Sequence, residues 1–186
     1  MKKIIFIILL ILLFSSVSVI SANEAPTSII LSYVVEKEAP VFELLVSKEE
    51  SGGYSNSAIE YLLSEWDLGS GEAKTFYFKI RQTNIANWNS KSAKIKISAG
   101  SLVNTISEYI HTDPPEISNL QFSELAIEEG ISGYISESDS SITINYPDES
   151  ISSNLDVVSF ACTWRGKIGI HSGDYKTTVV LSYSVD

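Results

Sequence analysis

The chain has 186 residues, with 23 acidic and 13 basic side chains and a formal net charge of −10 at pH 7. Such a charge argues against nucleic acid and anionic membranes as partners, because both are themselves negative. Hydrophobic residues make up 44% of the sequence, which is enough for one domain, or two small ones, with a sizeable buried core.

The first 22 residues contain the three parts of a secretory signal peptide. Two lysines precede an unbroken apolar run, Ile4–Phe14, and small residues follow as far as Ala22. A membrane-spanning helix needs about 20 apolar residues, so this run is too short to be one. We expect residues 1–22 to direct export and to be cleaved, with an uncleaved membrane anchor as the alternative. The mature domain, residues 23–186, then lies in the periplasm, at the cell surface or outside the cell, and contacts the membrane only during export.

Short β-strands are predicted along the rest of the chain, because apolar side chains recur at every second position. The predicted strands are Ile29–Val35, Val41–Val46, Ala58–Leu68, Thr75–Arg81, Ala93–Ala99, Leu102–Ile110, Ile117–Phe122, Ile131–Ile135, Ile142–Tyr146, Val158–Trp164 and Gly173–Asp186. Ala58–Leu68 also matches helical spacing, and we favour a strand because its neighbours are strands. Many short strands at this spacing are typical of sandwiches and barrels. We therefore expect an all-β, mostly antiparallel, immunoglobulin-like β-sandwich.

Asp113–Pro115 is the strongest candidate for a boundary within this domain. Its two prolines remove backbone donors and restrict the residue before them, so neither a sheet nor a helix passes easily through. The segment either separates two small domains or crosses between the two sheets of one sandwich. We expect the crossover.

The last predicted strand, Gly173–Asp186, has a one-sided pattern. One face carries most of its apolar side chains, which are Tyr175, Val179, Leu181 and Tyr183. Val158–Trp164 alternates in the same way, and the connection between the two is short. We expect these two strands to form a hairpin-type pair at the centre of the sandwich.

Cys162 is the only cysteine of the chain, so an exported form has no internal disulfide. Its position between Phe160 and Trp164, on the apolar face of a predicted strand, favours a small buried hydrophobic side chain. A reactive or intermolecular thiol is the alternative.

Motifs for catalysis and metal binding are missing from the sequence. His111 and His171 are the two histidines, and neither has the spacing that nucleophilic or zinc chemistry requires. The acidic pairs lack the residue order of a calcium loop. We expect no enzymatic activity, no cofactor and no metal site.

Two aromatic residues in polar loops support a second class of function. Trp88 lies in the Asn-rich loop Asn84–Ser90 and is the tryptophan to test as an exposed ligand platform, with a core-capping role as its alternative. Tyr54 lies in the polar loop Ser47–Asn56. Exposed aromatic rings of this kind are typical of a secreted β-sandwich module that binds carbohydrate or protein.

The C-terminal end resembles chaperone–usher fimbrial subunits and related pilin-like β-sandwich proteins. In that family a glycine commonly lies fourteen residues from the C-terminus, before an alternating strand that a periplasmic chaperone recognises. Gly173 is the fourteenth residue from the end of this chain, and Tyr175, Val179, Leu181 and Tyr183 supply the alternation. Val185 stands where the family often has a tyrosine.

The resemblance implies a non-catalytic structural or adhesive surface subunit. Such subunits join by strand donation, in which the N-terminal extension of a neighbour completes a sheet that lacks a strand. The implied partners are other copies or related subunits and a periplasmic chaperone. The donor segment would be Asn23–Val35, with four anchors at Ile29, Leu31, Tyr33 and Val35. The alternative is that Thr27–Val35 forms the first strand of the chain's own domain.

Overall fold

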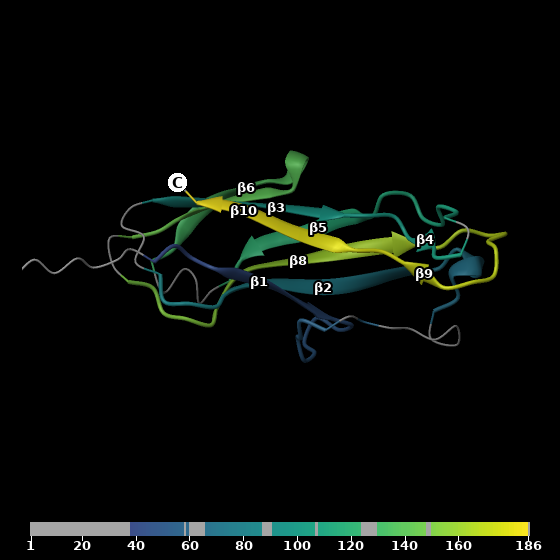
Figure 1. Ribbon diagram of the computed structural model, residues 1–186, viewed down its shortest axis with the longest axis horizontal. Helices are drawn as coiled ribbons and strands as arrows, with labels where there is room; N and C mark the ends of the chain where they lie inside the picture. The colour runs from purple at the N-terminus through teal and green to yellow at the C-terminus, as the bar shows by residue number, and fades with distance from the viewer. Residues whose placement is uncertain are drawn as a thin grey trace, which may run out of the picture. The chain divides into compact units, whose positions relative to one another are not determined.

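The computed structural model describes residues 38–57, 59, 66–86, 91–106, 108–123, 130–147 and 150–185. Within these ranges the chain is all-β, and neighbouring strands of each sheet are antiparallel (Figure 1). The predicted signal peptide and the segment 23–37 lie outside the described residues.

The strands form two four-stranded sheets and one small two-stranded sheet. In spatial order the first sheet contains β1 (Phe42–Ser47), β2 (Ala73–Gln82), β8 (Leu155–Arg165) and β5 (Glu116–Phe122). The second sheet contains β10 (Val179–Val185), β3 (Ser92–Ala99), β7 (Ser141–Asn145) and β6 (Ser132–Ser136). The small sheet pairs β4 (Val103–Asn104) with β9 (Tyr175–Lys176). Two single-turn 3-10 helices, η1 (Leu68–Ser70) and η2 (Glu137–Asp139), complete the described elements.

The two larger sheets bury their inner faces in one shared cluster. Ile95 of β3 and Ile142 of β7 are fully buried there, together with Phe78 of β2 and Phe160 of β8. The rings of Phe78 and Phe160 stack with centroids 4.9 Å apart. Each such side chain contributes about 1.5–3 kcal/mol when it is fully buried. The all-β prediction is thus confirmed, and this layering is consistent with a β-sandwich.

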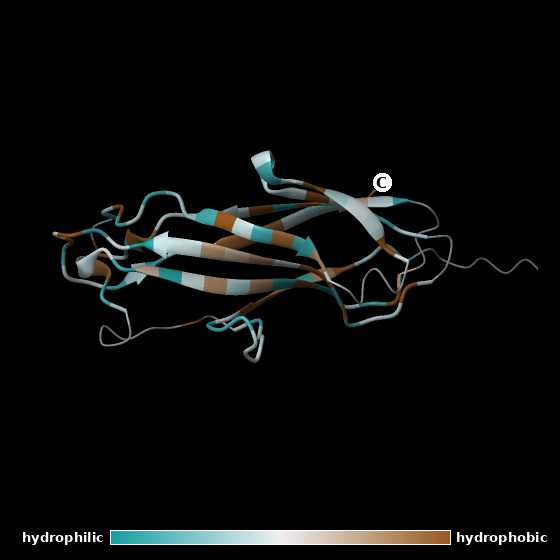
Figure 2. Cartoon of the chain, turned by 180° about the vertical axis from the view of Figure 1, so that it is seen from behind, coloured by the Kyte–Doolittle hydropathy of each residue, from teal (hydrophilic) through white to brown (hydrophobic). Residues whose placement is uncertain are grey.

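Alternating side chains explain why the long central strands form where they do. In β2 every second residue from Phe76 to Gln82 is buried, and the intervening ones are only partly buried. Figure 2 shows the corresponding alternation of hydrophobic and hydrophilic bands along the strands. Since successive side chains of a strand point to opposite faces, this pattern puts the apolar set in the core.

A buried polar group near the end of β2 connects the first sheet with the residue that follows β7 of the second sheet. Gln82 is fully buried, and its Oε1 accepts a hydrogen bond from the Tyr146 hydroxyl at 2.9 Å. Its Nε2 donates to the carbonyl oxygens of Asn84 and Ser152, at 2.9 and 3.2 Å. The side chain amide therefore has a partner at both ends, as a buried polar group requires.

Three features of the fold correct the predicted elements. The two strands expected to form a central hairpin, β8 and β10, belong to different sheets, because the chain between them enters the small sheet through β9. The strand expected over Leu102–Ile110 is cut to β4, since the chain turns at residues 105–106. Of the strand expected over Ala58–Leu68, most lies outside the described residues, and Leu68 at its end begins η1 instead.

The segment that contains Pro114 and Pro115 leads into β5. Before it the chain has passed through β3 in the second sheet, whereas β5 belongs to the first. Both large sheets therefore take strands from before and after these prolines.

Candidate functional site

The predicted C-terminal assembly strand is divided into two pieces. Tyr175 belongs to β9 and pairs with Asn104, whereas Val179–Val185 form β10 and pair with β3. The break lies at Thr177 and Thr178, which are held by Gly100 instead. The Gly100 N–H donates to the Thr178 carbonyl at 3.2 Å, and the Thr177 hydroxyl donates to the Gly100 carbonyl at 2.7 Å. The expected continuous strand is therefore corrected to two strands in different sheets.

Gly173 occupies a position that only glycine fits. Its φ is +143°, and a Cβ there would lie 2.7 Å from Nδ2 of the buried Asn104 side chain. Asn104 Nδ2 donates to the Ser172 carbonyl at 3.3 Å. The glycine thus permits the turn that brings the chain into β9.

The inward face of β10 is less well covered than the centre of its sheet. Val179 and Leu181 are partly buried against the core, whereas Ile97 of the neighbouring β3 is only 2% exposed. Tyr183 is 40% exposed, and its ring meets Phe42 of β1 edge to face with centroids 5.0 Å apart. The outer strands of the two sheets therefore approach each other along one side of the molecule.

These two outer strands differ in how their free edges are occupied. Within the described ranges, β10 pairs with β3 alone and has no strand on its other side (Figure 1). The free edge of β1 is partly used, because Val46 and Ser55 exchange two backbone hydrogen bonds of 2.8 and 3.1 Å. β10 is thus the more open edge.

Five residues that the sequence singled out cannot be placed. The predicted donor anchors Ile29, Leu31, Tyr33 and Val35, and the predicted ligand platform Trp88, lie outside the described residues. Tyr54, the other loop aromatic, is described and lines a pocket.

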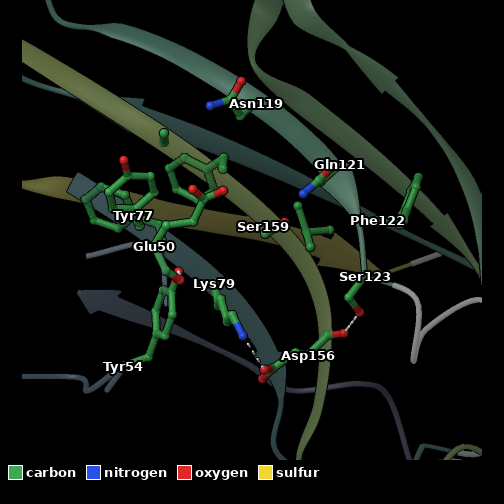
Figure 3. Close-up of a pocket in the computed structure, with 14 residues that line it drawn as sticks. Glu50, Tyr54, Tyr77, Lys79, Asn119, Gln121, Phe122, Ser123, Asp156 and Ser159 are labelled. Carbon is green, nitrogen blue, oxygen red and sulfur yellow. Dashed lines mark hydrogen bonds and ion pairs between the residues drawn. The ribbon is translucent and has the colours of Figure 1, made fainter. Parts of the chain in front are cut away.

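This pocket lies on the outer face of the first sheet and has a volume of about 350 Å³ (Figure 3). Its floor is the middle strand β8, which presents the small side chains of Ser159 and Ala161 between larger neighbours. Ala161 pairs with Tyr77 of β2, and Ser159 pairs with Lys79 of β2 and with Gln121 of β5. Small residues in the middle and long residues on either side make the surface concave.

One wall of the pocket depends on an irregularity in β5. The register between β5 and β8 shifts between Ser118 and Gln121, and Asn119 within this bulge has a φ of +54°. A β-bulge bends its strand and redirects its side chains. Figure 3 shows Asn119 and Gln121 on this side, with Tyr77, Glu50 and Tyr54 opposite.

Three charged groups at or beside the pocket are paired with one another. Asp156 accepts hydrogen bonds from Lys79 Nζ at 3.2 Å and from Arg81 Nε at 2.7 Å. Burial acts to raise the pKa of Asp156, but these two cations outweigh it and hold the pKa below its usual value. Lys79 Nζ also lies 4.6 Å from the centroid of the Tyr54 ring, and burial raises the pKa of that tyrosine. The two nearest cations thus share one carboxylate as their ion-pair partner.

Each histidine packs against a tyrosine that is distant in sequence, and the sequence did not predict these contacts. His111 is 3% exposed and its ring lies 4.5 Å from that of Tyr175, while His171 stacks on Tyr109 at 4.2 Å. Burial lowers the pKa of His111. No group of three or more His, Cys, Asp or Glu side chains suited to a metal ion occurs in the described part of the chain.

Cys162 is fully buried, which confirms the prediction of a small core side chain. Burial raises the pKa of its thiol to about 12, so the reactive thiolate is scarce at neutral pH. The described residues also contain no helix of the length and apolarity needed to span a membrane.

Comparison with known proteins adds no assignment. No protein-family model matches this sequence, and the search of curated proteins finds no significant match. The open edge of β10 and the pocket over β8 are therefore the two features on which function must be argued.

Proposed function

We propose that the chain is an exported, non-catalytic structural or adhesive surface subunit of the pilin-like type, and that copies join by strand donation. The immunoglobulin-like form of the sandwich belongs to this proposal. The single observation that supports it best is the open edge of β10, a terminal strand that has no partner on one side among the described residues and has an incompletely covered inner face.

A donated strand would both pair with the backbone of this edge and cover its inner face. Its backbone would pair with the free side of β10, and its inward side chains would cover Val179, Leu181 and the exposed part of Tyr183. An unpaired edge otherwise invites uncontrolled association. Within β10, the outward Val180 is 48% exposed and would remain so.

The segment Asn23–Val35 is the proposed donor, because four large side chains alternate along its second half. Ile29, Leu31, Tyr33 and Val35 would point into the partner, and Ser32 would point away. Donation to β10 rather than β1 also leaves the Val46–Ser55 pairing of β1 undisturbed.

The test is an immunoblot of native protein from cell fractions, with unheated and boiled samples side by side. We expect an SDS-resistant ladder that collapses to the monomer on boiling. Leu31→Asp should abolish the ladder, whereas the matched variant Ser32→Asp should keep it. A single monomer band in both lanes for the wild type, or a ladder that survives Leu31→Asp, would contradict strand donation by this segment.

The second candidate function is a secreted module that binds carbohydrate or protein. The pocket over β8 favours it, because it gathers two tyrosines and several amide and hydroxyl groups from three strands and a loop. Pockets of about 300–1,000 Å³ with a few convergent polar groups are the usual form of ligand sites.

A further inference from the structure

We propose that the pocket over β8 binds a neutral saccharide unit, presented as part of a larger glycan. This inference rests on the second candidate function and specifies its ligand class. It is independent of strand donation, since every residue used below belongs to the pocket.

The first argument is that several polar side chains in the pocket have no hydrogen-bond partner among the described residues. The side chains of Tyr77, Asn119, Gln121 and Ser159 line the pocket, and none of them forms a hydrogen bond with another described residue. Amides and hydroxyls donate and accept at once. Adjacent hydroxyl groups of a sugar ring also donate and accept, so they match such groups in pairs.

The second argument is charge. Lys79 is the one cation among the residues that line the pocket, and it is already held by Asp156 and by the Tyr54 ring. Glu50 adds a negative charge at the rim. An anionic ligand would find no free cation among these lining residues and would meet the Glu50 carboxylate, so a neutral ligand is favoured.

The third argument is the aromatic wall. Lys79 lies over the ring of Tyr54 and covers part of the face that a ligand would contact. Tyr77 is partly buried beside the small side chain of Ala161, and its ring forms one side of the trough (Figure 3). The negative face of an aromatic ring attracts the C–H groups on the apolar face of a sugar. Tyr77 is therefore the expected platform, and Gln121 lies diagonal to it on the other side of β8, opposite Lys79.

The experiment measures binding of the full mature chain to immobilised neutral oligosaccharides of glucose, galactose, mannose and N-acetylglucosamine, with an immobilised peptide library in parallel. We expect at least one neutral glycan to bind, with little change when salt is raised, because screening affects charged contacts most. Tyr77→Ala and Gln121→Ala should each weaken that binding about tenfold or more, the loss expected when one anchoring contact is removed.

Tyr134→Ala is the matched control, because Tyr134 is 63% exposed on β6 in the other sheet and lies outside the pocket. Near-ultraviolet circular dichroism of each variant shows whether its tertiary packing is retained. Glycan binding that Tyr77→Ala leaves unchanged in a folded variant would overturn the site. Binding of peptides alone, with dependence on Tyr77, would overturn the ligand class but keep the binding module. Absence of binding to both would overturn the second candidate function as well.

Discussion

The hydrogen bond between Tyr146 and Gln82 gives the sharpest stability prediction, because both partners are buried and the bond connects the end of β2 with the residue that follows β7. Tyr146→Phe removes the hydroxyl that donates to Gln82 Oε1 at 2.9 Å and leaves that oxygen without a donor, in a side chain with no exposed surface. A buried acceptor left unsatisfied costs about 1–3 kcal/mol. We expect the free energy of unfolding to fall by about 1–2 kcal/mol, since the phenyl ring keeps its packing.

A double-mutant cycle separates this interaction from packing. Gln82→Leu should cost more than Tyr146→Phe, because it also strips the Asn84 and Ser152 carbonyls of their donor. In the Gln82→Leu background, Tyr146→Phe should then cost about 0.5 kcal/mol or less, since its partner is already gone. The coupling free energy is therefore expected at about 1 kcal/mol.

Urea unfolding followed by tryptophan fluorescence measures each step at pH 7. Tyr134→Phe serves as the control, because that tyrosine is 63% exposed and should change stability by less than about 0.5 kcal/mol. Strictly additive effects in the cycle, or a Tyr146→Phe cost equal to that of the control, would refute the argument that this buried hydrogen bond stabilises the fold.

Three further outcomes are expected. Burial lowers the folded-state pKa of His111, so the unfolded state binds the proton first as pH falls. The free energy of unfolding, measured by urea titration, should therefore decrease below about pH 6.5. His111→Asn should make this decrease smaller. Cys162 should stay unmodified by a thiol reagent in the native protein and react fully in urea; rapid native labelling would contradict its burial. Gly173→Ala should lower the unfolding free energy by about 1–3 kcal/mol, because the new Cβ meets Asn104 at a φ of +143°, and an unchanged urea midpoint would argue against that conformation.

The sequence predicted strands best where one face of the strand is buried in the core and the other is exposed to solvent. Thr75–Arg81 and Ala93–Ala99 were predicted within a few residues of β2 and β3, because their alternation reports the core directly. The buried state of Cys162 followed from the same rule. Local pattern therefore determined the fold class and much of the core.

Pairing between distant strands carries information that local pattern does not contain. The alternating pattern of Gly173–Asp186 continues through Thr177, but the chain changes sheets there. At this point Gly100, which is distant in sequence, forms hydrogen bonds with the Thr178 carbonyl and the Thr177 hydroxyl. The sequence also did not predict the pocket. Tyr77 and Gln121 are 44 positions apart in sequence, and both line it only because β2 and β5 pair with opposite sides of β8. The local pattern predicted that Tyr77 and Lys79 lie on the outer face of their strand, but it did not predict which residues of other strands lie beside them.

The pairing at the free edge of β1 determines whether strand donation and ligand binding in the pocket can occur in the same subunit. Glu50 and Tyr54 belong to the loop that returns to pair Ser55 with the free edge of β1 at Val46. A strand added to β1 would displace that pairing and move one wall of the pocket, whereas a strand added to β10 would leave the wall in place. Donation at β10 thus allows each joined subunit to keep a working pocket. Joined subunits would then carry a row of identical sites, and a ladder species should hold a surface glycan more tightly than the monomer does, through multivalency rather than new contacts.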